Sequence, residues 1–307
     1  MLSNLPERTE MDFPTLSIQL LNALQYGLLL FLVASGLTLI FGIMGIINIA
    51  HGSFYMLGAY IAWSLAGALN GFWLSLVLGV VLTLILGIAL EWLFIRHLYD
   101  KNHLQQVLMT YGLILIFSEM RSILWGDDVY SLAIPEFLEG SIALTESLNY
   151  PIYRIWISGV CVLLALGMYY LIRHTRLGMM IRAGESNRRM TQALGININL
   201  IFRFVFALGV SLAAFSGMIS APVSSVFPGM GNQILILSFV VVVIGGLGSI
   251  KGAMLAALLV GLIDTFGKIV ELRVLGVPIL PELAGMSVFL LMAVILIFRP
   301  QGIFGKA

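Results

Sequence analysis

The sequence predicts an all-α integral membrane protein, a polytopic bundle of about nine transmembrane helices. Of its 307 residues, 60% are hydrophobic and only 10% are charged, whereas soluble domains average about 45–50% apolar and about 25% charged residues. No charged side chain occurs in residues 13–90 or in residues 204–250, and each run exceeds the roughly 20 residues of one bilayer-spanning helix. The runs are continuously apolar, which favours helices over the alternating strands of a membrane barrel.

Nine apolar segments are expected to cross the membrane, although eight or ten spans also fit the pattern. The polar N-terminus before them carries both signs of charge and lacks the basic-then-apolar layout of a cleaved signal peptide, so the first segment should remain as a helix. The whole chain, 1–307, is expected to form one transmembrane domain. The expected spans are 16–37, 53–70, 72–95, 105–125, 153–172, 200–222, 233–248, 252–269 and 283–299.

The apolar stretch 38–52, between the first two spans, is expected to be broken or re-entrant. It could continue the first helix, form a half-helix or make a re-entrant turn. Polar groups at membrane depth usually face a cavity or another helix, so two interpretations of its polar residues remain open. They form part of a gate or solute path, or they hydrogen-bond between helices, which is the interpretation we favour. The polar residues are Asn48 and His51, and in the gate interpretation Gly45 and Gly52 would allow close approach of the backbone.

The basic residues predict the orientation, because Lys and Arg concentrate in cytoplasmic loops. The loop 173–189 contains five Arg against one Glu, the segment 96–103 is also basic, and Arg299 and Lys306 lie near the C-terminus. These three regions should be cytoplasmic. The segment 125–150 is acidic, has no Lys or Arg, and suits the opposite side. Nine spans with the N-terminus outside satisfy all four placements.

The loop 173–199 is the strongest candidate functional segment. Residues 184–194 are predicted to form a short helix, with Glu185 in its first turn and Gly195 at its end. Helical spacing places Met190 together with Ala193 or Leu194, away from Arg188 and Arg189. An amphipathic helix held between two membrane spans can dock into a groove on a cytoplasmic partner. The alternative is a solvated basic loop that only fixes the topology.

Four blocks of the chain resemble the permease subunits of branched-chain amino acid ABC importers. They are the loop 182–197, the segment 35–60 (SGLTLIFGIMGIINIAHGSFYMLGAY), the segment 244–253 (IGGLGSIKGA) and the segment 298–305 (FRPQGIFG). Four such blocks in the right order are specific. In the loop the resemblance implies a cytoplasmic coupling segment, within 173–199, that contacts an ATPase. The expected coupling residues are Arg182, Ala183, Glu185, Arg188, Ala193, Gly195, Ile196 and Asn197.

The resemblance implies a partner set and a cargo. The chain would form half of a pore in the inner membrane of a bacterium. A second related permease, or a second copy, would form the other half, with two cytoplasmic ATPases that bind ATP and Mg and a periplasmic solute-binding protein. Branched-chain or other apolar amino acids are the expected cargo; urea, short amides and sugars remain alternatives. The sequence has no G-x-x-x-x-G-K-[ST] motif, so this chain itself should bind no nucleotide and no other cofactor.

The remaining polar features have structural interpretations. The glycine-rich segment Gly245, Gly246, Gly248 and Ser249 is expected to make a tight turn between two spans. Four charged residues lie in or at the ends of spans, and we interpret them as interfacial anchors or helix-pairing groups. They are Glu91, Glu119, Arg121 and Asp264.

Two other functional classes compete with this interpretation. An ion-coupled secondary transporter would need an essential carboxylate, for which Asp264 is the candidate, and would act without an ATPase. An intramembrane enzyme would need a nucleophile or metal cluster, but the chain has one cysteine, Cys161, and four histidines without metal-site spacing. The net charge of +1 gives no indication of a nucleic-acid partner.

Overall fold

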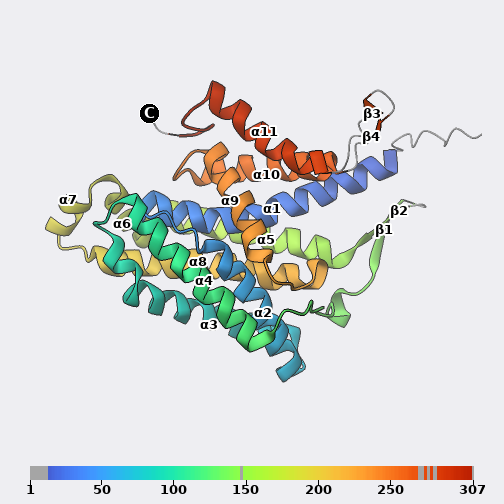
Figure 1. Ribbon diagram of the computed structural model, residues 1–307, viewed down its shortest axis with the longest axis horizontal. Helices are drawn as coiled ribbons and strands as arrows, with labels where there is room; N and C mark the ends of the chain where they lie inside the picture. The colour runs from blue at the N-terminus through green and yellow to red at the C-terminus, as the bar shows by residue number, and fades with distance from the viewer. Residues whose placement is uncertain (1–12, 146–147, 269–272, 275–276, 279–281, 306–307) are drawn as a thin grey trace, which may run out of the picture.

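The computed structural model describes residues 13–145, 148–268, 273–274, 277–278 and 282–305, and Lys306 lies outside them. This part of the chain is a helical bundle with eleven α-helices (Figure 1). They are α1 Phe13–Met44, α2 His51–Leu69, α3 Phe72–Leu93, α4 His103–Trp125, α5 Ile152–His174, α6 Arg176–Ser186, α7 Arg188–Ala193, α8 Ile198–Ser224, α9 Met230–Gly245, α10 Ile250–Gly267 and α11 Glu282–Phe298.

Short elements join some of these helices. The 3-10 helix η1 (Ile95–Leu98) follows α3, and the 3-10 helix η2 (Glu136–Leu138) lies between α4 and α5. Two small antiparallel hairpins complete the described structure, β1 (Ser141–Thr145) with β2 (Leu148–Pro151) and β3 (Arg273–Val274) with β4 (Val277–Pro278). The bundle is therefore helical throughout its apolar part, as predicted.

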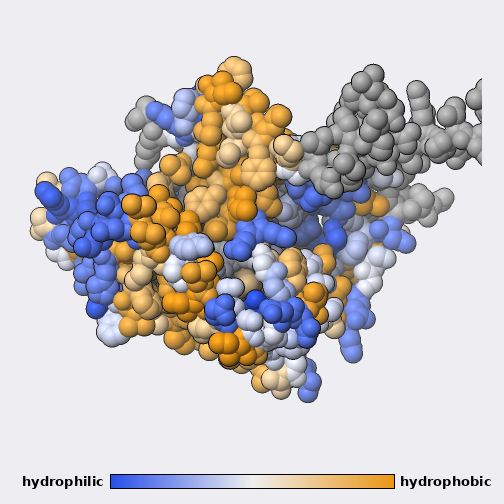
Figure 2. All heavy atoms as spheres, in the orientation of Figure 1, coloured by the Kyte–Doolittle hydropathy of each residue, from blue (hydrophilic) through white to orange (hydrophobic). Residues whose placement is uncertain are grey.

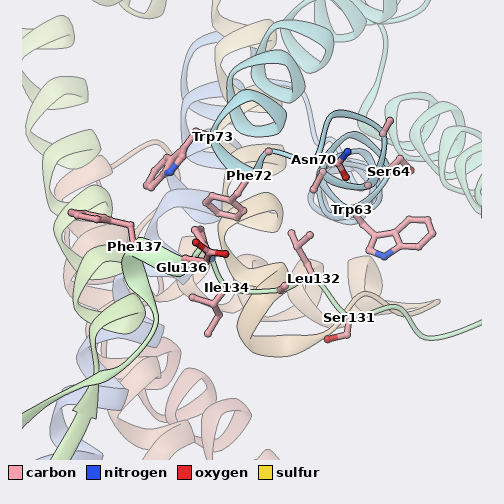
Figure 3. Close-up of a pocket in the computed structure, with 16 residues that line it drawn as sticks. Trp63, Ser64, Asn70, Phe72, Trp73, Ser131, Leu132, Ile134, Glu136 and Phe137 are labelled. Carbon is pink, nitrogen blue, oxygen red and sulfur yellow. The ribbon is translucent and has the colours of Figure 1, made fainter.

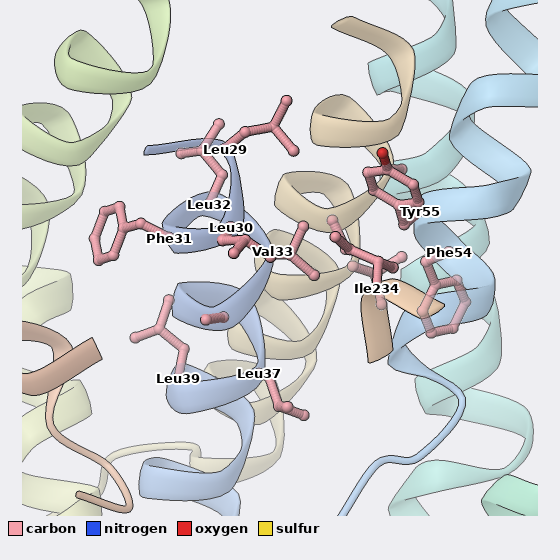
Figure 4. Close-up of a cluster of buried hydrophobic side chains, with 14 of the residues drawn as sticks. Leu29, Leu30, Phe31, Leu32, Val33, Leu37, Leu39, Phe54, Tyr55 and Ile234 are labelled. Atoms are coloured by element: carbon pink, nitrogen blue, oxygen red, sulfur yellow. The ribbon is translucent and has the colours of Figure 1, made fainter. Parts of the chain in front are cut away.

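Helices α1 and α8 form the centre of the bundle. In their most apolar windows 89% of α1 and 61% of α8 is buried, against 17–39% for α3, α4, α5 and α10. Helix α1 is apolar on all sides, which is typical of a helix enclosed by others. Figure 4 shows Val33 of α1 facing Ile234 of α9, and the leucines of α1 belong to the same buried cluster as Phe54 and Tyr55 of α2. The apolar outer faces of the surrounding helices need lipid as their solvent.

Small residues allow helix backbones to approach closely, as in other membrane bundles. A Cβ atom on Gly36 of α1 would lie 2.5 Å from the carbonyl oxygen of Gly209 of α8. A Cβ atom on Gly217 of α8 would lie 2.0 Å from the carbonyl oxygen of Tyr55 of α2. These positions fix how α1 and α2 cross α8.

We expect Gly217→Ala to lower the free energy of unfolding by about 1–3 kcal/mol, because α2 and α8 must separate to admit the new methyl group. Gly167→Ala is the matched control, since a Cβ atom there meets nothing within 4 Å and alanine favours helix by roughly 0.5–1 kcal/mol. The melting temperatures of the two variants in detergent provide the measurement. Equal decreases would contradict the packing argument.

Successive long helices reverse direction, so the bundle has two polar ends. At the end formed by α6 and α7, Arg188 bonds both Met44 at the end of α1 and Tyr99 after α3. At the opposite end, Arg154 at the start of α5 bonds Asn22 near the start of α1. Figure 2 shows hydrophilic side chains over α6 and α7 and an apolar band across the middle of the molecule.

Six helices are long and apolar enough to cross a bilayer, which makes the chain a multi-pass membrane protein. They are Thr15–Met44 within α1, and α3, α4, α5, α8 and α10. Helices α2, α9 and α11 lie where spans were predicted, but they are shorter or less apolar. Their crossing stays a prediction, and so does the total of nine.

The predicted break after the first span is short. Helix α1 continues to Met44, only residues 45–50 are non-helical, and α2 begins at His51. Gly45 adopts φ +67°, a conformation that favours glycine. Of the three possibilities for 38–52, the first is therefore found, a continued helix followed by a six-residue break.

The predicted helix 184–194 is wrong. Helix α6 begins at Arg176 and ends at Ser186, and a separate short helix, α7, follows. The cause is Asn187, which is extended at φ −154° and whose side chain caps α7 by accepting a hydrogen bond from the N–H of Met190. Glu185 therefore lies in the last turn of α6. Gly195 follows α7 with φ +84°.

Candidate functional site

The blocks that stood out in the sequence meet at the α6–α7 end of the bundle. The N–H groups of Ile303 and Phe304 donate to the carbonyl oxygens of Ile244 and Gly245, at 2.8 and 3.1 Å. The C-terminal segment 299–305 thus lies on the turn between α9 and α10. On its other side, a Cβ atom on Gly42 of α1 would lie 2.9 Å from Cα of Gly248.

The turn itself has the geometry expected of its glycines. Gly246 and Gly248 adopt φ values of +97° and +82°. The Ser249 side chain caps α10 by accepting a hydrogen bond from the N–H of Gly252 at 3.1 Å. Gly245 lies at the end of α9 and contacts α10 through Gly252. All four residues therefore shape the turn and the α9–α10 contact.

A groove of about 650 Å³ lies between α6 and this turn. We call it the α6 groove. Arg182 and Glu185 of α6 line one side, and Gly248, Ser249 and Lys251 line the other. Arg182 also donates to the carbonyl oxygen of Ile172 in α5, which holds α6 against the end of that span. The structure thus brings two predicted coupling residues to the predicted turn.

Helix α7 and its C-cap residue, Leu194, present an apolar pair to solvent. Met190 and Leu194 are 59% and 74% exposed, and they are four residues apart, so they share one face. Four more of the predicted coupling residues flank this face. Ala193, Gly195 and Asn197 are exposed and Ile196 is half-buried. Ala183, in contrast, is half-buried on α6 and belongs to neither surface.

Arg188 connects α7 to the centre of the bundle. Its Nη2 donates to the carbonyl oxygen of Met44 at 2.7 Å, its Nη1 donates to that of Tyr99 at 3.4 Å, and its guanidinium lies 4.6 Å from the ring centroid of Phe202 in α8. A cation at the C-terminus of α1 is favourable because unpaired carbonyl groups point there. We call these contacts the Arg188 junction. A displacement of α7 would pull directly on the end of α1, beside the break 45–50.

Gln106 holds the break, although it was not predicted from the sequence. Its side chain is 3% exposed. Its Oε1 accepts a hydrogen bond from the N–H of Ile47, and its Nε2 donates to the carbonyl oxygens of Leu98 and Lys101, each at 3.3 Å. The signal that could have found it is an amide in the first turn of an apolar span, where polar groups need partners.

A buried ion pair connects α3 to α8 near the same end. Glu91 is fully buried and accepts a hydrogen bond from Nε of Arg203 at 2.7 Å. It also accepts one from the hydroxyl of Tyr99. Burial raises the pKa of Tyr99, and the hydrogen bond to Glu91 and its charge raise it further. The hydroxyl therefore stays protonated and remains a donor.

The other charged residues in or beside spans have different surroundings. Arg121 pairs with Asp127 and Asp264 with Lys268, whereas Glu119 is exposed on α4. The geometry of Arg121 and Asp264 agrees with pairing roles.

Asn48 and His51 make contacts within the bundle. Nε2 of His51 lies 3.0 Å from the carbonyl oxygen of Val33 in α1, and the ring is fully buried. Oδ1 of Asn48 accepts a hydrogen bond from the N–H of Ala50 at 3.1 Å. These contacts favour the interpretation that both residues hold the broken segment in place.

An open cavity of about 710 Å³ lies next to these residues, between α2, α4, α9 and α11. We call it the α9 cavity. Ile49 and Ser53 line it together with Asn232 of α9, but most of its wall is apolar. In the described chain, none of Gly45, Asn48, His51 and Gly52 lines it. Gly52 lies behind the wall, where its close contact with Gly231 holds α2 against α9.

The opposite end of the bundle carries a third hollow, of about 750 Å³. Figure 3 shows aromatic side chains around it: Trp63 from α2, Phe72 and Trp73 from the start of α3, and Phe137 from η2, beside Glu136. Within the described residues, no group of three or more His, Cys, Asp or Glu side chains could hold a metal ion anywhere in the bundle.

Comparisons with known proteins show which family the chain resembles. Residues 19–298 match the family described as branched-chain amino acid transport system, permease component. The high-affinity branched-chain amino acid transport system permease protein BraD of Pseudomonas aeruginosa is 33% identical over 304 residues, covering 94% of this chain and 95% of that protein. LivH of Escherichia coli (strain K12), with the same description, is 27% identical over 304 residues with the same coverage.

A relative that is named for a different cargo, the sugar ribose, also matches the chain. The ribose import permease protein RbsC of Escherichia coli (strain K12) is 27% identical over 295 residues, which cover 92% of this chain and 86% of that protein. No solved structure matches the chain significantly.

Proposed function

This chain belongs to the family of permease components of branched-chain amino acid transport systems, and we propose that it forms one half of the pore of an ATP-driven importer. The observation that carries the proposal is the Arg188 junction, which connects an exposed helix directly to the central helix α1. A partner that pushes or pulls α7 would thereby move the end of α1 and the break before α2. The chain supplies the pore, and the partner supplies the energy.

The α6–α7 end is the surface that we assign to the ATPase. The α6 groove offers charged side chains on α6 and at the turn, and α7 offers the apolar pair Met190 and Leu194. A partner groove could receive such a pair as it receives an amphipathic helix. The loop 173–199 and the C-terminus would lie on the cytoplasmic side of a bacterial inner membrane. Two ATPases, which bind the ATP and Mg, would dock here, one on each permease.

The α9 cavity is our candidate for this chain's half of the solute path. It is open, and its wall is mainly apolar with a few hydroxyl and amide groups. A second related permease, or a second copy, would close it. Because such a wall gives a zwitterion few strong contacts, most of the selectivity would lie with a periplasmic solute-binding protein. The aromatic hollow with Glu136, at the opposite end, is the surface that this binding protein would reach.

The experiment that tests the proposal is reconstitution with the ATPase and binding-protein partners. Glu185→Ala and Gly195→Ala should each lower binding-protein-stimulated ATP hydrolysis about tenfold, equivalent to about 1.4 kcal/mol of coupling energy. Membrane insertion should stay normal. Glu119→Ala is the matched control, because Glu119 is exposed on α4 and lines neither the α6 groove nor the aromatic hollow.

Three results would count against the proposal. Uptake by the wild-type chain without any ATPase would favour ion-coupled transport instead. Labelling of an Arg182→Cys variant from the outer face of the membrane would remove the docking surface. Unchanged coupling in Glu185→Ala would remove only the role of that residue.

Sugar import is a second candidate function, favoured by the ribose permease relative. The two cargoes can be separated by the binding protein, because uptake stimulated by a leucine-loaded and not by a ribose-loaded binding protein would exclude the sugar alternative.

A further inference from the structure

A polar cavity of about 440 Å³ lies at the end of the bundle opposite α6 and α7. Its volume falls in the roughly 300–1,000 Å³ range of small-molecule sites. Helices α1, α2, α5, α8 and α10 all contribute to its wall, so it lies between helices at this end of the bundle, and it shares no lining residue with the α9 cavity. The polar residues that matter to the argument are Asn22, Gln25, Arg154, Asp264 and Lys268. We call it the outer polar cavity.

The charges of this cavity leave one positive charge without a negative partner. Nζ of Lys268 lies 2.5 Å from Oδ2 of Asp264, and the two side chains are 60% and 9% exposed. This pair therefore runs from the surface into the bundle. Arg154 bonds only a neutral group in the described chain, because its Nη1 donates to Oδ1 of Asn22 at 2.7 Å. An anionic group would supply the missing charge.

Gln25 provides a second, independent indication of a ligand. It is 6% exposed and lines the cavity, yet its side-chain amide makes no hydrogen bond with any residue that the structure describes. Because the side chain lines the cavity, its amide is available to hydrogen-bond a molecule bound there.

The rest of the wall suits an aliphatic group. The ring of Tyr26 and the side chains of Leu29 and Val223 face the same cavity. One compartment thus combines unpaired positive charge, a carboxylate, a free amide and an apolar wall. These are the groups that an α-amino acid with a branched aliphatic side chain requires.

We propose that the outer polar cavity binds a branched-chain amino acid. Its carboxylate would bind Arg154 and Lys268, and its ammonium group would bind Asp264 and the carbonyl oxygen of Gln25. The inference takes the chemical class of the ligand from the proposed function, but the site is distinct from the α9 cavity and from the ATPase surface. It assigns Asp264 to ligand binding and not to ion coupling.

The experiment is photolabelling of the full chain in lipid nanodiscs with L-photo-leucine, the diazirine analogue of leucine, without any partner subunit. After irradiation, mass spectrometry should place the label in residues 19–29, 220–224 or 264–268. Leucine should compete with the label. Leucinamide, which lacks the carboxylate, and 4-methylpentanoate, which lacks the ammonium group, should each compete at least about tenfold less well.

Two variants test the site, and the first of them keeps the test independent of folding. Gln25→Met removes the amide at equal length, should not destabilise the chain because no bond within the described protein is lost, and should lower labelling about tenfold. Arg154→Gln should also lower it about tenfold. Arg96→Gln is the control that should leave labelling unchanged, because Arg96 lies at the other end of the bundle over the Trp92 ring.

Several results would overturn this inference. They are labelling that maps to residues 229–243 of the α9 cavity, labelling that leucine does not reduce, and unchanged labelling in both variants. Competition by 4-methylpentanoate that equals competition by leucine would remove the zwitterion assignment. Each of these could occur while ATP-driven uptake in the reconstituted system is intact, so failure here is distinguishable from failure of the proposed function.

Discussion

Glu91→Ala is expected to lower the free energy of unfolding by about 3 kcal/mol. Removing one partner of a buried ion pair usually costs roughly 3–5 kcal/mol, because the other charge is left without compensation. The low end applies here because the remaining partner, Arg203, keeps 33% of its side chain exposed and can be partly rehydrated. The Tyr99 hydroxyl also loses its acceptor.

The measurement is the melting temperature of the purified chain in detergent. Glu119→Ala is the matched control, since Glu119 lies on another long helix but is exposed, and its melting temperature should stay close to that of the wild type. The double variant Glu91→Leu/Arg203→Met should recover most of the loss, because replacing both members of a buried pair with apolar groups is often neutral. A single Glu91→Ala variant that melts like the control would contradict the role of this pair.

The contribution of Tyr99 should not depend on pH in the physiological range. Because its folded-state pKa is raised, the stability that the protonated hydroxyl contributes is present below the ordinary tyrosine pKa. It is lost only as the pH rises through the folded value.

The positions of the membrane helices could be predicted from the sequence, since lipid imposes long apolar runs and places charges at their ends. All nine predicted spans overlap helices of the structure. The exact ends could not be predicted. Helix α1 runs to Met44 through a segment whose glycines suggested an earlier break, because Gly42 lies against the Gly248 backbone and needs no side chain there.

Local hydrogen bonding is also the reason that the predicted helix 184–194 was wrong. The pattern 184–194 reads as one helix by spacing alone, but Asn187 competes for the backbone and begins a new helix. Whether the Asn187 side chain bonds the backbone depends on its conformation, and an asparagine within a polar stretch does not reveal that conformation.

The candidate site could be predicted from the sequence only in its local parts. The loop 173–199 was identified because its features are contiguous in sequence. The Arg188 junction joins residues 144 positions apart, and the bond from Ile47 to Gln106 joins residues 59 positions apart. Such contacts follow from the packing of the bundle and leave no periodic pattern. The outer polar cavity was missed for the same reason, because five helices contribute to it.

Arg188→Ala is expected to uncouple transport from ATP hydrolysis. The substitution removes two charge-assisted hydrogen bonds to backbone carbonyl groups and the stacking on Phe202. With partial solvent exposure taken into account, these contacts should hold α7 against α1 by about 2 kcal/mol, or about a thirtyfold preference for the docked position. Without them, a movement of α7 is no longer transmitted to the end of α1.

The reconstituted importer provides the measurement, as the number of amino acid molecules taken up per ATP hydrolysed. Arg188→Ala should lower this ratio at least tenfold while ATP hydrolysis continues, because the ATPase still finds Met190 and Leu194 on α7. Arg188→Lys should restore part of the ratio, since an ammonium group can donate to Met44 but cannot reproduce the planar stacking.

Arg189→Ala is the matched control, because Arg189 is adjacent, carries the same charge and is exposed. If both variants lower the ratio equally, the charge of the loop matters and the junction does not. If Arg188→Ala lowers ATP hydrolysis and uptake in proportion, Arg188 acts in docking of the ATPase. Only a lower ratio of uptake to ATP hydrolysis, partly restored by lysine, requires that the movement driven by the ATPase be transmitted through α7 to the end of α1.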